Sequence, residues 1–258
     1  MSHSFKGRHA EFYDLFYQAK PYAAEAQFVH EKLLAHGVDP SSSRVLELAC
    51  GTGKHALLLA ALGHTMTATD SSTEMIAVAQ AKAETSNLPV TFSVQDMRHL
   101  PKPPVPQDAA ICLFDSIGYV QTDQALDQVF AGVHSSLRPG GLFIVEFWHA
   151  PTMLGHFEPV RVRRISTPDG TVVRTSETTL DRSLSLARVN INIYDLRNDG
   201  TYDHVAETQV NRFFTVSEME RLAAKHGFRT LSTHAGFQDN VSVTDETWHV
   251  VAVLQKLA

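Results

Sequence analysis

Short apolar runs alternate with amphipathic segments over the first 150 residues of the chain. The apolar runs have the length of buried strands, and the segments between them repeat apolar side chains every three or four residues, as helices do. The strands that this pattern predicts are Arg44–Cys50, Thr65–Thr69, Val90–Val94, Ala109–Phe114 and Leu142–Phe147. Because parallel strands need crossover helices, we expect five parallel strands with helices on both faces of the sheet.

The pattern changes after Trp148 to alternating apolar and polar positions, which indicates strands with one buried face. The turn signals Pro168-Asp169-Gly170 and Asn198-Asp199-Gly200 join consecutive strands into hairpins. The antiparallel strands predicted here are Val160–Arg164, Thr171–Thr179, Ser185–Tyr194 and Tyr202–Phe213. A helix and two further strands follow, over Ser217–His226, Phe228–Ser232 and Thr247–Leu254.

Two helices, separated by Pro21, are predicted before the first strand. With a length of 258 residues, the pattern predicts an α/β fold with a Rossmann-like, doubly wound sheet of seven strands and an antiparallel β insert after the fifth strand. We divide the chain into an N-terminal helical part, the core of the sheet, the insert and a C-terminal part that completes the sheet, over residues 1–38, 39–150, 151–213 and 214–258.

The charge balance argues against nucleic acid and anionic membranes as partners. The chain has 28 acidic and 22 basic side chains and a formal net charge of −6, which repels both. Its one basic cluster, Arg161, Arg163 and Arg164, lies in an alternating stretch, and we interpret it as the polar face of a strand. No apolar run approaches the ~18 residues of a membrane helix, and the N-terminus lacks a signal-peptide core, so we expect a cytoplasmic protein.

The cysteines and histidines show no spacing typical of a disulfide framework or a metal site. Cys50 and Cys112 fall at the ends of predicted core strands, where we expect reduced, buried thiols. The 14 histidines form no HExxH pattern and no CxxC-linked set. We therefore expect no bound metal.

Glycine or polar residues stand at the ends of four predicted parallel strands, on the edge of the sheet where ligands bind in doubly wound folds. These strand ends are Glu47–Gly53, Asp70, Asp96–Met97 and Phe114–Ser116. Gly51 and Gly53 would let a ligand approach the backbone closely. They also leave two interpretations open, because Gly51, Gly53 and Ala56, followed by Asp70, fit a dinucleotide-binding loop as well.

A nucleoside that carries a charged amino-acid tail fits the complete set of strand ends. Asp70 offers two acceptor oxygens to the hydroxyls of a ribose. Asp96 can accept from the amino group of an adenine, and the Met97 thioether can contact the face of the ring. The reacting group would then lie near Phe114–Ser116, where the second substrate must arrive.

Five segments resemble, in order and spacing, the motifs of class I S-adenosylmethionine (SAM) dependent methyltransferases: VLELACGTGKHA, TATDSSTEMIAVAQ, VQDM, DAAICLFDSIGYV and LRPGGLFIVEFW. The resemblance covers Arg44–Trp148 and implies the class I methyltransferase fold, SAM as the cofactor and S-adenosyl-L-homocysteine (SAH) as the product. One departure is Ala49, a small residue that stands where the family has a glycine and should still fit. The cofactor-binding residues that we expect are Tyr22, Glu47, Ala49, Gly51, Gly53, Asp70, Ser71, Met75, Gln95, Asp96, Met97 and Phe114.

The flanking segments HAEFYDLFYQAKPYAAEA and FDSIGYV, with the insert, resemble the aminosugar N,N-dimethyltransferases, whereas EFWHAPTML, PVRVRR and DETW resemble methyltransferases of bacterial surface-polysaccharide genes. The resemblance implies an N-terminal helical lid, contact of Tyr22 with the cofactor's carboxylate, and a small, sugar-like acceptor methylated on nitrogen or oxygen. The aminosugar enzymes also carry an arginine near the C-terminus that meets a nucleotide diphosphate. Asp239, Asp245 and Glu246 stand in that stretch here, which favours a neutral or cationic acceptor.

Methyl transfer by in-line displacement needs a deprotonated nucleophile held about 3 Å from the methyl carbon. Tyr119 occupies a position where the aminosugar enzymes can carry a histidine that acts on the substrate; with a usual pKa near ~10, its phenol suits an orienting role better than that of a base. Tyr13 either covers the cofactor or packs onto the sheet, and His149 is either a base or a loop residue. The catalytic residues that we expect are Tyr119, Tyr13 and His149, with Tyr17, Glu146 and His249 as further candidates.

Two other functions remain open at this stage. The glycine loop alone would allow an NAD(P)-dependent oxidoreductase, although such an enzyme has no reason to carry the VQDM and LRPGG segments. A non-catalytic SAM-binding protein is the other alternative. The exposed strands of the insert could also pair between two copies of the chain and form a homodimer.

Overall fold

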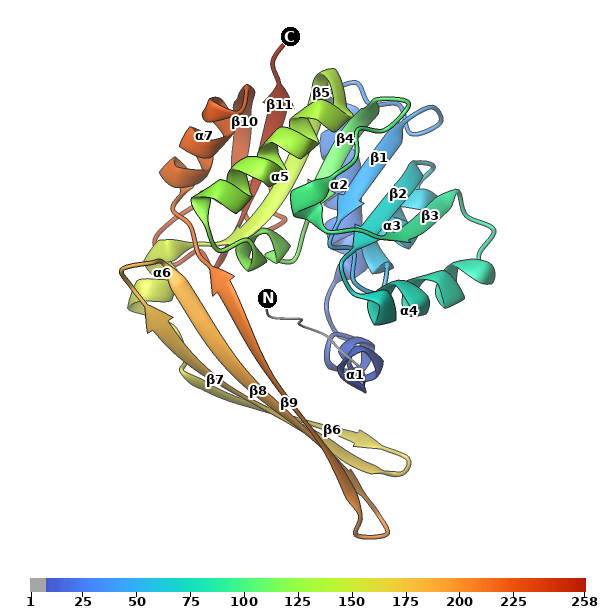
Figure 1. Cartoon of the computed structure of the whole chain (residues 1–258), viewed down its shortest axis with the longest axis vertical. Helices are drawn as coiled ribbons and strands as arrows, with labels where there is room; N and C mark the ends of the chain where they lie inside the picture. The colour runs from blue at the N-terminus through green and yellow to red at the C-terminus, as the bar shows by residue number, and fades with distance from the viewer. Residues whose placement is uncertain (1–7) are drawn as a thin grey trace.

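The structure, a computed structural model, describes the backbone of residues 8–258 and the side chains from residue 12 onward. A seven-stranded sheet with helices on both faces forms the larger part, and a separate four-stranded sheet extends from it (Figure 1). Helix α1 (Arg8–Phe16) contacts both α4 and the first strand of the smaller sheet. Within the described residues, no helix has the length and apolar character needed to cross a membrane.

The seven-stranded sheet has the order β10-β11-β5-β4-β1-β2-β3. Strands β1 to β5 pair in parallel, whereas β11 pairs antiparallel with both β5 and β10. The strands are β1 (Arg44–Leu48), β2 (Thr65–Asp70), β3 (Val90–Val94), β4 (Gln107–Cys112), β5 (Leu137–Trp148), β10 (Phe228–Ala235) and β11 (His249–Lys256). This confirms the predicted doubly wound sheet of seven strands, and it places the carboxyl ends of β1 to β5 along one edge.

Each face of this sheet is covered by its own set of helices. One apolar cluster joins the sheet to α2 (Tyr22–Ala35), α3 (Lys54–Ala61) and α4 (Thr73–Glu84). A second cluster joins the opposite face to α5 (Asp123–Ser136) and α7 (Val216–Lys225). Because β1 and β4 are covered on both sides, consecutive residues of these strands are buried instead of every second one.

Side-chain caps fix where three of these helices begin. The Ser72 hydroxyl accepts from the Met75 N–H at the start of α4 and caps this helix. Thr122 caps α5 in the same way. Thr215 and Glu218 form a reciprocal capping box at the start of α7.

The four-stranded sheet is an antiparallel meander of β6 (Val160–Thr167), β7 (Gly170–Asp181), β8 (Leu186–Arg197) and β9 (Tyr202–Arg212). The two predicted turns join β6 to β7 and β8 to β9, as expected. Gly170 is required at the first turn, because a Cβ there would lie 1.9 Å from the carbonyl oxygen of Leu196. Val172, Ile191 and Ile193 on one face of this sheet pack with Phe16 of α1.

Two features depart from the predicted elements. Strand β5 begins at Leu137, ahead of the predicted start at Leu142, because Leu137 already pairs with Gln107 of β4. The short helix α6 (Ala150–Gly155) follows β5 directly. Its six residues are too few for an amphipathic repeat to be recognised in the sequence.

Candidate active site

A cavity of about 1010 Å³ lies between the carboxyl edge of the seven-stranded sheet and the four-stranded sheet. The loops after β1 to β4 line one side of this main cavity, residues of β6 to β9 line the other, and Tyr13 and Tyr17 of α1 also contribute. A smaller hollow of about 30 Å³, called here the side hollow, shares Tyr13, Ala49 and Phe114 with it. The four polar strand ends identified in the sequence therefore meet at one site.

The loop after β1 turns through left-handed backbone at Ala49, Gly51 and Gly53, with φ of +51°, +54° and +77°. Ala49 and Gly51 line both cavities. Gly53 lines neither; a Cβ there would lie 2.6 Å from the ring of Phe92. Gly53 therefore permits close packing against β3 instead of lining the space for a ligand.

Asp70, at the end of β2, holds two segments of the site in place. One carboxylate oxygen accepts from the Gly51 N–H at 2.9 Å, and the other accepts from the Ser72 N–H at 2.8 Å. Burial raises the pKa of this carboxyl, although these backbone hydrogen bonds oppose the rise. Each oxygen keeps a further lone pair, so Asp70 can still accept from hydroxyl groups of a ligand.

Five more of the expected residues line the main cavity: Ser71 and Met75 after β2, and Gln95, Asp96 and Met97 after β3. The Asp96 carboxylate accepts from the backbone N–H and the guanidinium of Arg98, and these hydrogen bonds lower its pKa. Asp96 is therefore ionised and has a fixed orientation. The pairing with Arg98, which also lines the cavity, was not predicted.

The side hollow contains an unpaired buried carboxylate oxygen. Glu47 on β1 is 2% exposed, and its Oε2 has no hydrogen-bond partner among the described residues. Burial and the nearby charge of Asp70 raise the pKa of Glu47 to about 8. A ligand ammonium group would provide the missing partner. Tyr22 and Lys54 also line this hollow, and the Lys54 Nζ lies 4.7 Å from the centre of the Tyr22 ring.

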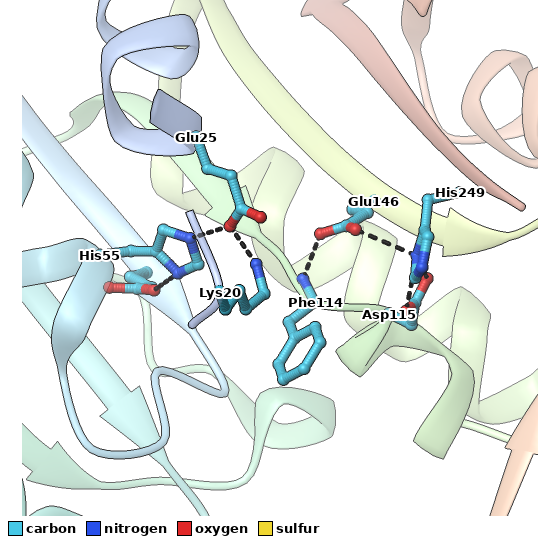
Figure 2. Close-up of polar contacts among 8 residues, drawn as sticks. Lys20, Glu25, His55, Phe114, Asp115, Glu146 and His249 are labelled. Carbon is cyan, nitrogen blue, oxygen red and sulfur yellow. Dashed lines mark hydrogen bonds and ion pairs between the residues drawn. The ribbon is translucent and has the colours of Figure 1, made fainter. Parts of the chain in front are cut away.

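A chain of ionisable residues connects α2 to the side hollow. His55 Nε2 lies 2.8 Å from Glu25 Oε2, and the same carboxylate pairs with Lys20 (Figure 2). His55 Nδ1 faces Glu47 at 3.9 Å. This chain fixes the position of α2, which carries Tyr22, against the end of β1.

A second polar cluster surrounds the end of β4. Phe114 and Asp115 have left-handed backbone with φ of +56° and +55°, and the Phe114 N–H donates to Glu146 Oε2. His249 Nδ1 lies 3.0 Å from Asp115 Oδ2 and 3.2 Å from Glu146 Oε1 (Figure 2). Two consecutive non-glycine residues in this conformation are strained, and such strain is concentrated at functional sites.

The cluster keeps His249 charged. Burial alone would lower the pKa of His249, but the charges and hydrogen bonds of Asp115 and Glu146 raise it well above its usual range. Burial also raises the pKa of Asp115, while the charge of His249 opposes that rise. One ring nitrogen of His249 and one carboxylate oxygen each of Asp115 and Glu146 lie within 4.8 Å of one another, a grouping that the sequence did not predict. Their mutual hydrogen bonds and ion pairs account for it.

The three residues expected to be catalytic differ in position. Tyr119 lines the main cavity, and its hydroxyl group donates to Gln209 Oε1 of β9 at 3.2 Å. Burial raises the pKa of this phenol above its usual value. Tyr13 lines the cavity as well, and its ring lies 4.8 Å from that of Tyr17. His149 does not line it: the chain turns into α6 at this residue, and its buried ring faces the carbonyl of Thr247 at 3.2 Å. His249 takes the place in the cavity that was expected for His149.

Arginines of the four-stranded sheet also reach the main cavity. Arg161 and Arg163 of β6 and Arg174 of β7 line it, whereas Arg164 does not. The interpretation of the basic cluster as a polar strand face is therefore incomplete, because that face borders the cavity. Arg161 and Arg163 are two positions apart, which places both side chains on one face of the strand. That spacing could have indicated that the two arginines act together, apart from Arg164.

Residues 45–141 match the family of methyltransferase domains. A Bacillus subtilis protein provisionally named as a methyltransferase, YqeM, is 28% identical over 89% of this chain and 89% of its own length. The dTDP-3-amino-3,4,6-trideoxy-alpha-D-glucopyranose N,N-dimethyltransferase of Streptomyces venezuelae is 28% identical over 86% of this chain and 90% of its own. The structure of a SAM-dependent methyltransferase from Clostridium acetobutylicum superimposes with a TM-score of 0.83, at 21% identity, over 97% of this chain and 98% of that one.

The fold is that of the class I methyltransferases: a seven-stranded sheet with antiparallel β11 beside β5, and a ligand cavity at its carboxyl edge. Taken with the domain match and the relatives, this identifies the protein as a methyltransferase. The solved structures that superimpose on it include methyltransferases bound to SAM or SAH. Neither an NAD(P)-dependent oxidoreductase nor a non-catalytic SAM-binding protein is supported by these comparisons.

Proposed function

We propose that the protein methylates a nitrogen or oxygen atom of a small molecule, and that the cofactor and the acceptor share the main cavity. Asp70, Asp96 and Met97 would bind the adenosine of the cofactor, and Glu47 would receive its ammonium group. The observation that carries this placement is the unpaired Oε2 of the buried Glu47 beside the glycine loop. Tyr22 and Lys54 border the same hollow and suit the cofactor's carboxylate.

When bound, SAM supplies an electrophilic methyl group, and the residues of this chain have to orient the acceptor. Tyr119 is the residue that we propose for this role, because its phenol lines the cavity and its raised pKa keeps the proton on the hydroxyl group. We propose that Tyr13, on α1, helps to cover the same space as part of a helical lid.

The charged state of the polar cluster favours an acceptor that needs no strong base. His249 is held protonated by Asp115 and Glu146, so it is not available to remove a proton at neutral pH. An amine reaches its reactive form more readily than a sugar hydroxyl does. The Streptomyces venezuelae relative is, by its name, an N,N-dimethyltransferase of a dTDP-linked amino sugar. We therefore propose an amine, on a small and sugar-like molecule, as the preferred acceptor.

Methyl-labelled SAM tests this proposal. We expect the wild-type protein to transfer label to small molecules of a bacterial metabolite extract, and to amines in preference to hydroxyl compounds. The variant Tyr119→Phe should lower this transfer while SAH affinity stays within about twofold, since the phenol is assigned to the acceptor. Label found only in protein or nucleic acid fractions would contradict the proposal.

Three further expectations from the sequence remain proposals. These are the cytoplasmic location, the pairing of two copies through the four-stranded sheet, and the division of the chain at residues 38, 150 and 213. The exposed side chains of Val160 and Val162 on the edge strand β6 are consistent with the pairing of two copies through this sheet.

A further inference from the structure

The four-stranded sheet presents two arginines to the main cavity in directly opposed positions. Arg163 of β6 and Arg174 of β7 are register partners in an antiparallel pair, so their side chains leave the same face of the sheet. Both line the cavity. Like charges placed directly opposite each other destabilise a sheet, so this arrangement costs stability unless an anion lies between them.

Neither arginine is neutralised within the part of the chain that the structure describes. Arg161 pairs with Glu158, but Arg163 and Arg174 form no ion pair with a described carboxylate. Arg163 donates to the carbonyl of Phe16 at 3.1 Å, and Arg174 donates to the Tyr17 hydroxyl at 3.3 Å. The Nε of Arg174 is buried and has no acceptor among the described residues. A buried donor left in this state costs free energy, which a bound acceptor atom would recover.

The arginines belong to the acceptor's half of the cavity. Ser176 and Thr178 continue the same face of β7 and line the cavity beside Arg174. The charge of Arg174 is close enough to Tyr119 to oppose the rise in the Tyr119 pKa. The opposite half is bordered by Asp70 and other carboxylates, which repel anions.

The carboxylates that had suggested a neutral or cationic acceptor lie elsewhere. Residues 239–246 do not line the main cavity. Asp239 pairs with Lys32 of α2 instead. That expectation therefore has no support from the site, whose unneutralised charges on the acceptor's side are positive.

We propose that Arg163 and Arg174 bind an oxyanion of the acceptor, a carboxylate or a phosphate group. The proposal rests on the proposed function, since it assigns a chemical group to the same small-molecule acceptor. Guanidinium groups suit this role because their planar N–H donors match two oxygens of a carboxylate or phosphate at once. Ser176 and Thr178 would add hydroxyl donors.

A competing role for the two arginines is to anchor α1, because they donate hydrogen bonds to Phe16 and Tyr17 of the segment at its end. If the arginines only anchor α1, their replacement should weaken cofactor binding, because α1 is the proposed lid. If they form an oxyanion site, their replacement should weaken anion binding and leave cofactor affinity nearly unchanged. The two roles can thus be separated by measuring both affinities in the same variants.

The test is calorimetric titration of SAH-saturated protein with acetate, inorganic phosphate and pyrophosphate at constant ionic strength. We expect saturable binding to the wild type; acetate alone would indicate a carboxylate site, and phosphate or pyrophosphate a phosphate site. Arg163→Gln and Arg174→Gln should each weaken that binding by about tenfold, as expected for loss of a charge-assisted contact. Arg174→Lys should keep part of the affinity, because it retains the charge but not the planar fork.

Arg164→Gln is the matched control, because Arg164 neighbours Arg163 on β6 but does not line the cavity. It should bind the anions as the wild type does. Absence of saturable anion binding by wild-type protein that binds SAH would overturn the proposal. Unchanged anion affinity in the two glutamine variants would also overturn the proposal. An equal loss of SAH affinity and anion affinity would overturn it as well, because that result identifies the arginines as an anchor for α1. Failure of the wild type to bind SAH would instead refute the proposed function itself.

Discussion

At the scale of single residues, the site depends on carboxylates that differ in their partners. Asp70 is held by two backbone N–H groups, whereas Glu47 has an oxygen without a partner among the described residues. The first arrangement orients a carboxylate for further hydrogen bonds, and the second leaves a buried oxygen atom that a donor group of a ligand can pair with. The two residues should therefore respond differently to substitution.

Replacement of Asp70 should weaken cofactor binding. We expect Asp70→Ala to reduce SAH affinity by about 1.5–3 kcal/mol, the size of a hydrogen bond to a charged group. Calorimetry measures this directly. Asp199→Ala is a suitable control, because the Asp199 carboxylate accepts from Thr201 at the exposed turn between β8 and β9. Unchanged affinity in Asp70→Ala would show that the ribose contact is assigned to the wrong residue.

Glu47 should couple cofactor binding to proton release. Its pKa of about 8 in the free protein leaves it mostly protonated at pH 7, and an ammonium group beside it would lower that pKa. Binding of SAH at pH 7 should then release up to one proton per site. The measurement is the binding enthalpy in buffers of different ionisation enthalpy. Glu47→Gln should remove the buffer dependence; a wild-type enthalpy independent of buffer would contradict this account.

The location of a residue could be predicted from the sequence where that residue directly follows a parallel strand. Asp70 and Met97 reach the cavity because strand ends determine their place. His149 has the same kind of position but faces away, because α6 begins there. The meeting of Glu146 with His249 depends on the pairing of β5 with β11, a long-range antiparallel register that local patterns do not reveal.

At the scale of elements, the ends of β4, β5 and β11 are joined by the ion pairs of His249. The pKa of His249 is raised above its unfolded value of about 6.5, so the stabilisation is complete below that pH and is lost as the pH rises through the folded-state value. The three strand ends therefore share a pH-dependent contribution to stability.

The pH dependence of unfolding tests this contribution. Between pH 6.5 and about 9.5, the free energy of unfolding of the wild type should fall more steeply than that of the double variant Asp115→Asn/His249→Gln, by up to about 1 kcal/mol per pH unit. The double variant removes both members of the His249–Asp115 pair at once, while Glu146 keeps its hydrogen bond from the Phe114 N–H. Denaturant titrations at several pH values provide the measurement. Parallel curves for the two proteins would refute the account.

The elements themselves were largely predictable. Periodicity located the five parallel strands and the four antiparallel ones, because each has a consistent buried pattern. Helix α6 was missed because it is short. The start of β5 was missed because the pairing of Leu137 with Gln107 of β4 is a long-range contact that the local pattern does not show. What the pattern could not show was which face of the insert borders the cavity.

At the scale of the whole molecule, two sheets of different kinds enclose one cavity. The seven-stranded sheet lies on one side and the four-stranded sheet on the other (Figure 1). The loops of the first sheet carry Tyr119 and residues proposed for the cofactor, and the second sheet carries the two arginines proposed for the acceptor. The net charge of −6 conceals the local excess of arginine on the second side. Because the same cofactor half can serve many acceptors, the choice of acceptor depends on the four-stranded sheet and α1.

Calorimetric titration of the wild-type protein with SAM, SAH and NADH tests the central claim most directly. We expect SAM and SAH to bind at one site per chain and NADH to give no binding heat, since Glu47 and Asp70 suit an amino-acid tail and a ribose in adjoining spaces. Tight binding of NADH together with no heat from SAM or SAH would contradict it.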